Sequence, residues 1–212
     1  MTNKRLSGLY AITDSSQEQL ANEVELALKG GARIIQYRDK SPDQVKRLAQ
    51  ANKLLDLCRR HSAYLIINDD VDLASAVAAD GVHLGQDDLD ITSAREMLGD
   101  QAIIGISCYN RLDLAITAQE AGADYVAFGR FFPSRSKPEA VQAEIGLLQE
   151  AKKSLQLPIV AIGGITPENG APLVVAGADM LAVIQGVFGQ RNIRAAAEQF
   201  EKLFEQNEDA AS

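Results

Sequence analysis

The sequence predicts an α/β protein, a single (β/α)8 TIM barrel that spans residues 1–212. Short segments rich in β-branched residues alternate with amphipathic segments of helical period along the whole chain. Such alternation is typical of a parallel sheet with right-handed helical crossovers. Eight strand candidates favour a closed barrel over an open flavodoxin-like sheet, and 46% apolar residues suffice for one buried core.

Eight segments have the composition of strands that are covered on both faces, because several are almost continuous apolar runs. In chain order they are Leu9–Thr13, Arg33–Arg38, Tyr64–Asn68, Gly81–Leu84, Ile103–Ser107, Tyr125–Phe128, Ile159–Ile162 and Met180–Ile184. Helical periodicity lies between them, for example over Glu18–Lys29, Pro42–Arg60 and Leu112–Ala121. The stretch between the third and fourth strands is short for a helical crossover.

A weak internal repeat precedes several of these strands and supports the barrel. Its copies are Gly30-Gly31-Ala32, Ala79-Asp80-Gly81, Ala121-Gly122-Ala123-Asp124 and Ala176-Gly177-Ala178-Asp179. Each copy offers a glycine exit from a helix or a tight helix-to-strand turn. No linker or shift in composition divides the chain, so we expect one domain, with residues 205–212 as a disordered acidic tail.

Charge and composition restrict the classes of function. A net charge of −8 argues against nucleic-acid binding, which needs a basic surface. No apolar run approaches the roughly 18–20 residues that span a bilayer, and no signal-peptide core precedes the first strand. Cys58 and Cys108 form neither a disulfide framework nor a metal-ligand spacing. We therefore expect a cytoplasmic protein that acts on small molecules, with no membrane or nucleic-acid partner; whether it forms a homo-oligomer is left open.

Cations and an amide occur where a barrel places its active site, at the carboxyl end of a strand. The second strand ends in Gln36-Tyr37-Arg38-Asp39-Lys40. Alternation sends Gln36 and Arg38 to one side and leaves Lys40 just beyond the rim. This set suits a diphosphate, because a guanidinium group binds phosphate in bidentate fashion. A surface salt bridge between Arg38 and Asp39 is the alternative.

Acidic residues follow the third and fourth strands, in Asn68-Asp69-Asp70 and in Gly85-Gln86-Asp87-Asp88. Carboxylates on neighbouring strand ends can share one hard cation, with phosphate oxygens and waters completing the octahedron. The alternative is that Asp69 or Asp70 caps the next helix. The fifth strand ends at Ser107, a hydrogen-bond donor at the rim.

The last three strand ends offer anion-binding loops. The loop Gly129–Pro138 contains two serines and several cations, which predicts a binding loop that closes over substrate or, alternatively, a solvated basic turn. The paired glycines of Ile162–Pro167 expose backbone N–H groups, and Thr-Pro there begins a helix. With Ile184-Gln185-Gly186, they match the recurrent phosphate site after strands seven and eight. His61 and His83 are expected to be structural.

Six motifs in chain order resemble the thiamine-phosphate synthase family, and the resemblance extends from about Leu9 to Phe188. They are Gln36-x-Arg-x-Lys40, Asn68-Asp69, His83-Leu-Gly-Gln-x-Asp88, Gly105-Ile-Ser107, Ser134-x-Ser-Lys137 and Gly163-Gly-Ile165. The resemblance implies a transferase that joins a hydroxymethylpyrimidine diphosphate to a thiazole phosphate, with release of pyrophosphate and with Mg2+ as cofactor.

The resemblance also implies a role for each matched residue. Asp69 and Asp88 would coordinate Mg2+, and the motif spacing selects Asp88 over Asp87. Arg38, Lys40, Ser107 and Lys137 would be catalytic and, with Gln36 and Asn68, would hold the pyrimidine diphosphate. The thiazole phosphate would contact Ser134, Arg135, Ser136, Gly164 and the backbone of Ile184 and Gln185. The chain departs from the family at Gln185, where a serine is common, and at Ser134 and Ser136, where threonines are common.

Two other functions compete with this interpretation. A sister family of tautomerases aromatises the thiazole ring on a similar barrel, but it needs no diphosphate clamp and would use a rim histidine as general base, for which neither histidine here is well placed. A non-catalytic sensor of phosphorylated ligands would keep the glycine loop and could lose the metal-binding carboxylates.

Overall fold

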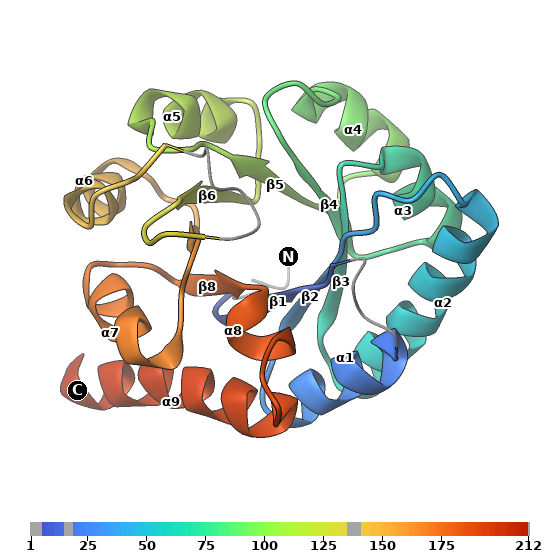
Figure 1. Cartoon of the computed structure of the whole chain (residues 1–212). Coiled ribbons are helices and arrows are strands. Elements are labelled where there is room, and N and C mark those ends of the chain that lie inside the picture. Colours follow the sequence, from blue (N-terminus) through green and yellow to red (C-terminus); the bar gives the residue numbers. More distant parts are fainter. Residues whose placement is uncertain (1–5, 15–18, 135–140, 212) are drawn as a thin grey trace.

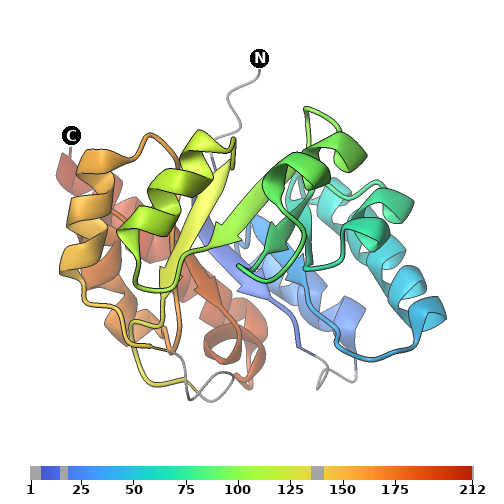
Figure 2. The same ribbon diagram turned by 90° about the horizontal axis from the view of Figure 1, so that it is seen from above.

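The computed structural model, which describes residues 6–14, 19–134 and 141–211, is a closed barrel of parallel strands surrounded by helices (Figure 1). Each strand pairs with the next along the chain, and the last strand pairs with the first to close the barrel. Figure 2 shows the strand arrows running in a common direction inside the layer of helices. The predicted fold class is confirmed, and the open flavodoxin-like alternative is wrong.

The strand positions agree closely with those expected from the sequence. The strands are β1 (Gly8–Ile12), β2 (Ile34–Tyr37), β3 (Tyr64–Asn68), β4 (Gly81–Leu84), β5 (Ile103–Ser107), β6 (Tyr125–Gly129), β7 (Ile159–Ile162) and β8 (Met180–Val183). The helices are α1 (Leu20–Lys29), α2 (Gln44–Arg60), α3 (Val71–Val77), α4 (Ile91–Leu98), α5 (Leu112–Glu120), α6 (Gly146–Ser154), α7 (Pro167–Val175), α8 (Gln185–Phe188) and α9 (Ile193–Ala211). None of the described helices is both long enough and apolar enough to cross a membrane.

Period-two alternation along the strands separates two apolar cores. One set of strand residues points outward and packs under the helices, as Leu65 and Ile104 do. The alternate set points into the barrel, where Ile66, Ile103 and Val160 fill the interior. The inner set therefore determines which side chains reach the carboxyl ends of the strands.

The internal repeat has a structural role at the amino ends of the strands. Asp80, Asp124 and Asp179 each precede an even-numbered strand and accept a hydrogen bond from the backbone N–H of Leu65, Ile104 and Ile159, respectively, at 2.8–2.9 Å. Each aspartate thus ties the start of one strand to the preceding strand. The sequence predicted turns at these positions, and the structure adds the carboxylate link.

The short connection between β3 and β4 holds a complete helix, α3, because both of its ends are well terminated. The Asp70 side chain accepts from the Leu73 N–H at 2.8 Å at the helix start, and Ala78 ends it in a left-handed conformation with φ +50°.

The acidic tail differs from its expectation, since residues 205–211 continue α9 rather than being disordered. Helix α9 lies alongside α1, α7 and α8 (Figure 1), and it buries Ala197 and Phe200 against the barrel. Once one face is anchored, the helix-favouring Glu, Gln and Ala of the tail extend it at little cost.

Candidate functional site

A cavity of about 540 Å3 opens at the carboxyl ends of the strands. Strand ends and the loops that follow them form its wall, as the barrel fold predicts. Eight of the predicted site residues line it: Gln36, Arg38, Asn68, Ser107, Ser134, Gly164, Ile184 and Gln185. Three further ones, Arg135, Ser136 and Lys137, lie outside the described residues.

The end of β2 presents Arg38 to the cavity without a competing carboxylate. The Asp39 carboxylate accepts from the Lys46 ammonium group at 2.9 Å and from the Ser41 N–H at 2.7 Å. The Arg38–Asp39 salt bridge considered as an alternative is therefore not formed. Within the described ranges, the Arg38 guanidinium forms no ion pair, and the Arg38 backbone N–H donates to the Thr13 hydroxyl at 3.0 Å. The guanidinium is thus available to an anion in the cavity.

The structure separates the roles of the two aspartates after β3. Asp70 caps α3 and also forms an ion pair with Arg47 at 2.6 Å. Asp69 takes no part in that cap, and its backbone is left-handed with φ +62°. The helix-capping alternative therefore applies to Asp70 and leaves Asp69 for another role.

Asp69 lies against Asp88, the predicted second metal ligand. Burial raises the pKa of the Asp69 carboxyl, and the neighbouring Asp88 carboxylate raises it further, while Lys40 acts in the opposite direction. The Asp88 carboxylate also accepts from the Gly85 N–H at 2.7 Å, which fixes its position in the loop after β4. Two carboxylates on adjacent strand ends are thus held in mutual repulsion.

The two carboxylates of Asp69 and Asp88 are a donor set that fits a magnesium ion. Among the residues described, no group of three or more His, Cys, Asp or Glu side chains is placed to hold a metal. Magnesium commonly takes one or two protein carboxylates and completes its octahedron with waters and substrate phosphate. A cation between Asp69 and Asp88 would also relieve their repulsion.

The opposite wall of the cavity is formed by close-packed loop backbone. The Phe132 N–H donates to the Gly163 carbonyl at 3.0 Å and so joins the loops after β6 and β7. Gly164 has φ +64°, and a Cβ there would lie 2.3 Å from the Pro133 carbonyl oxygen. Only glycine permits this approach. The predicted helix start follows, where the Asn169 side chain accepts from the Thr166 N–H at 2.8 Å.

At the end of β8, the side chain of Gln185 is bonded within the protein. Its amide donates to the Asp14 carboxylate at 3.0 Å, and its backbone carbonyl accepts from Gln190 at 3.1 Å. The backbone of Ile184 and Gln185 therefore borders the cavity, while the Gln185 side chain is attached to the loop after β1.

Sequence reasoning missed three polar residues inside the barrel: Tyr10, His83 and Tyr125. His83 was expected to be structural and remote from the rim, but it lines the cavity and its Nε2 lies 2.9 Å from the Ser107 hydroxyl. Period-two alternation gave a usable signal, because it sends His83 to the same side as Gly81, into the barrel. The apolar neighbours of His83 belong to the outer face.

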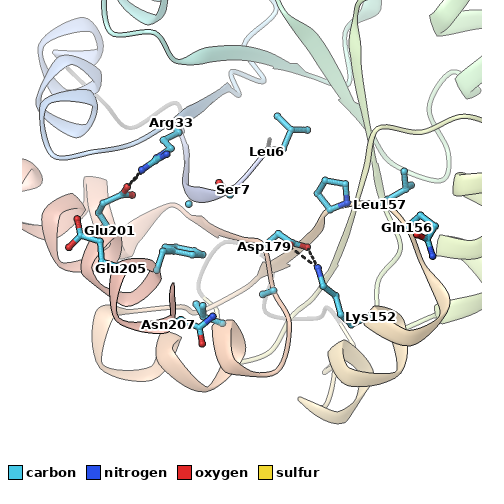
Figure 3. A pocket seen from close by; sticks show the side chains of 15 residues that line it. Leu6, Ser7, Arg33, Lys152, Gln156, Leu157, Asp179, Glu201, Glu205 and Asn207 are labelled. Atoms are coloured by element: carbon cyan, nitrogen blue, oxygen red, sulfur yellow. Dashed lines mark hydrogen bonds and ion pairs between the residues drawn. The ribbon is translucent and has the colours of Figure 1, made fainter. Parts of the chain in front are cut away.

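A second cavity, of about 570 Å3, opens at the amino ends of the strands (Figure 3). Two ion pairs line it: Arg33 points to Glu201, and the Lys152 ammonium group lies 2.7 Å from the Asp179 carboxylate. Active sites of this fold lie at the carboxyl ends of the strands, and conserved features at the amino ends serve stability. The candidate site is therefore the cavity that contains Arg38 and Ser107.

Comparisons with known proteins identify the family to which the chain belongs. Residues 9–187 match the family described as thiamine monophosphate synthase. The chain is 57% identical to a thiamine-phosphate synthase of Nitrosococcus oceani, over 94% of this chain and 93% of that one. It is 52% identical to a thiamine-phosphate synthase of Thioalkalivibrio sulfidiphilus, over 96% and 98% of the two chains.

A solved structure gives the same result. The thiamine phosphate pyrophosphorylase of Pyrococcus furiosus superposes with a TM-score of 0.87 at 37% identity, and the match covers 94% of this chain and 96% of that one. The motifs, the barrel and the relatives point in one direction: the chain belongs to the thiamine monophosphate synthase family of enzymes.

Proposed function

We propose that this enzyme condenses 4-amino-2-methyl-5-hydroxymethylpyrimidine diphosphate with a thiazole phosphate, forming thiamine monophosphate and pyrophosphate. One observation carries the proposal: a single cavity has cationic and hydroxyl groups on one wall and glycine-rich backbone on the other. Arg38 and Ser107 lie on the first wall, and Gly163 and Gly164 lie on the second. Two anionic substrates can therefore bind with their reacting ends facing each other.

The first wall suits the diphosphate that leaves. Arg38 and Lys40 follow β2, Asn68 ends the neighbouring strand β3, and Ser107 ends β5 on the same side of the barrel as β3 and β4. A diphosphate leaves readily only when its developing negative charge is neutralised by fixed positive groups and donors. In the proposal, these residues and Lys137 hold the diphosphate, and Gln36 contacts the pyrimidine.

A magnesium ion would be held by Asp69 and Asp88, and when bound it would neutralise charge on the leaving diphosphate. Burial is the largest cause of the raised pKa of Asp69 and the nearby Asp88 carboxylate is the next, and this second carboxylate supports the assignment. The positive charge of Lys40 acts on the same carboxyl and lowers its pKa, and in the proposal Lys40 binds the same phosphate oxygens.

The second wall suits the thiazole phosphate. Ser134, Gly164 and the backbone of Ile184 and Gln185 border this part of the cavity. We assign the phosphate to these groups together with Arg135 and Ser136, since loops after strands seven and eight are the recurrent phosphate site of the fold.

In the proposed reaction, the bond from the pyrimidine methylene carbon to the diphosphate oxygen breaks, and the thiazole nitrogen forms the new bond to that carbon. The aminopyrimidine can stabilise the positive charge of a dissociative displacement. The protein contributes positioning and electrostatics, and no covalent bond to the enzyme is required. We also assign the enzyme to the cytoplasm, where the free and buried Cys58 and Cys108 would stay reduced.

The test is pyrophosphate release from the purified enzyme with both substrates and Mg2+, repeated with each component omitted. We expect release only when all three are present. We also expect Asp69→Ala and Asp88→Ala to abolish the Mg2+-dependent turnover. Release without the thiazole phosphate, or Mg2+-dependent turnover that survives either substitution, would contradict the proposal.

The same assay separates the competing functions. His83 lies in the cavity, so the lack of a rim histidine no longer argues against a tautomerase. The diphosphate wall and the carboxylate pair still do, because a tautomerase needs neither of them. Binding of thiazole phosphate without pyrophosphate release would favour the tautomerase or the sensor.

A further inference from the structure

A continuous chain of hydrogen bonds crosses the interior of the barrel and joins two residues of the proposed substrate site. The Gln36 amide donates to the Tyr10 hydroxyl at 2.7 Å, and the Tyr10 and Tyr125 hydroxyls are 2.8 Å apart. The Tyr125 hydroxyl lies 2.9 Å from His83 Nδ1, and His83 Nε2 lies 2.9 Å from the Ser107 hydroxyl. Five side chains from five strands thus form one linear network.

One direction of donation gives both tyrosine hydroxyls of this chain an acceptor. Burial raises the pKa of both tyrosines, so each hydroxyl keeps one proton to donate. Tyr10 already receives the Gln36 N–H, so its own proton goes to the Tyr125 oxygen. The Tyr125 proton then goes to His83 Nδ1. In a neutral imidazole the other nitrogen, Nε2, carries the proton and donates it to Ser107.

A doubly protonated imidazole does not fit the same contacts. Its Nδ1–H would donate to Tyr125, whose proton would then have to go to Tyr10. Tyr10 would receive protons from both Gln36 and Tyr125, and its own proton would lack an acceptor within the network. An unsatisfied buried hydroxyl is costly, which disfavours this arrangement.

We propose that Tyr10, Tyr125 and His83 are positioning residues that fix the direction of this chain, so that His83 is the Nε2–H tautomer and the Ser107 hydroxyl donates its proton into the cavity. Ser107 receives one hydrogen bond from His83 and does not need its own proton for that contact. Its backbone is held separately, because the Gln86 amide donates to the Ser107 carbonyl at 2.6 Å. The hydroxyl proton is thereby directed to an anionic oxygen.

Gly105 makes the network possible. A Cβ at this position would lie 1.9 Å from the Tyr125 Cζ atom, so the tyrosine ring occupies the space that any other residue would fill. The ring also stacks on His83, with centroids 5.6 Å apart and planes 20° from parallel, and meets Tyr10 edge-on. Gly105, which lies on the same strand as Ser107, thus leaves room for the Tyr125 hydroxyl between Tyr10 and His83.

This inference rests on the proposed function only in naming the acceptor, which would be an oxygen of the leaving diphosphate. The direction of the chain is a property of the protein without substrate. It can therefore be tested by spectroscopy, independently of turnover.

The test is a long-range 1H–15N correlation spectrum of the 15N-labelled enzyme without substrates. The sequence has two histidines, so a His61→Gln variant leaves the imidazole signals of His83 alone. We expect an unprotonated Nδ1 and a protonated Nε2 at neutral pH. A protonated Nδ1, in either the neutral or the cationic form, would overturn the proposal whatever the activity of the enzyme.

Tyr125→Phe tests the positioning role, because it removes the hydroxyl and keeps the stacked ring. We expect both His83 tautomers to become populated, kcat to fall about tenfold as one net hydrogen bond is lost, and KM for the thiazole phosphate to stay unchanged. Tyr37→Phe is the matched control, since it loses a tyrosine hydrogen bond to Gln50 of 2.7 Å outside this network. The control should change neither the tautomer nor kcat.

Gly105→Ala provides a second route, because the added methyl group displaces the Tyr125 ring and should also mix the tautomers. An unchanged His83 spectrum and unchanged kcat in Tyr125→Phe would overturn the positioning role. If the unsubstituted enzyme shows the expected tautomer but releases no pyrophosphate, the proposed function fails while the direction of the chain stands.

Discussion

The two ends of the barrel use charged side chains in opposite ways. At the amino ends of the strands, Asp124 and Asp179 bond both to a backbone N–H and to a cation, Arg95 or Lys152. At the carboxyl ends, Arg38 forms no ion pair within the described ranges, and Asp69 faces another carboxylate. The amino end pairs Asp124 and Asp179 internally, whereas the carboxyl end pairs Asp39 and Asp70 but leaves Arg38 and the Asp69–Asp88 pair for ligands.

This difference shows how one fold can separate stability from function. Satisfied charges at the amino ends join neighbouring strands and so stabilise the barrel. Unsatisfied or repelling charges at the carboxyl ends cost stability, and an active site retains them because a ligand relieves the cost. Substitutions at the two ends should therefore change different measurements.

The largest expected effect is on turnover, from Arg38→Ala. Removing one fixed donor to a developing anion lowers kcat by about a hundredfold or more. The Tm should stay unchanged, because the guanidinium forms no ion pair with the described residues. Pyrophosphate release and thermal unfolding of the same preparation check this. A fall in Tm as large as the one expected below for Asp179→Ala would contradict the proposed difference between the two ends.

The reverse pattern is expected for Asp179→Ala at the amino end. It removes the acceptor of the Ile159 N–H and the partner of Lys152. We expect a loss of about 1–2 kcal/mol, or roughly 2–8 °C in Tm, with kcat unchanged. Asp179→Asn keeps an acceptor oxygen and loses the charge of an ion pair that solvent partly screens, so it should cost less than half as much. Equal losses in the two variants would show that the charge dominates.

A smaller effect links stability to pH at the carboxyl end. The raised pKa of Asp69 means that the folded protein retains this proton to higher pH than the unfolded chain does, so its ionisation lowers stability as pH rises through the raised value. The proposed magnesium ion would bind the ionised carboxylate. The increase in Tm caused by Mg2+ should therefore be small below the pKa of Asp69 and grow above it.

Asp69→Asn is the matched variant for this measurement. Without Mg2+ it should be more stable than the natural protein at pH 8, because the repulsion from Asp88 is relieved. With Mg2+ it should show no increase in Tm at any pH. A Mg2+ effect that persists in Asp69→Asn would move the ion away from this carboxylate.

The sequence predicted those features that depend on neighbouring residues and on chain order. Alternation placed Gln36 and Arg38 on the inner side of β2, and four strands have the predicted bounds. Chain order predicted that the carboxylates after β3 and β4 would meet, because consecutive strands are adjacent in a barrel. It left open which aspartate caps α3, since Asp69 and Asp70 differ only in backbone geometry.

What the sequence did not reveal depends on contacts between distant strands. Tyr10 and Tyr125 are 115 positions apart, and their bond follows from barrel register and from the space at Gly105. The carboxylate links of the repeat also reach across strands. The helical end of α9 was not predicted, because residues 205–212 were judged by their polar composition alone. The buried apolar face that anchors this helix, which includes Phe200, precedes that segment.

The smallest expected effect concerns Gln185, a residue at the carboxyl end that behaves like those at the amino end. Its side chain is hydrogen-bonded to Asp14, so the neighbouring backbone is left as the proposed phosphate contact. Gln185→Ser, which restores the serine common in the family, should change KM for the thiazole phosphate by less than about threefold, since it alters no backbone N–H. Gly164→Ala should raise the same KM by about tenfold or more, because its Cβ would displace the loop at Pro133. A large fall in KM in Gln185→Ser would instead show that the serine hydroxyl binds the phosphate. In that case this chain has the Gln185–Asp14 hydrogen bond in place of a side-chain contact to the ligand.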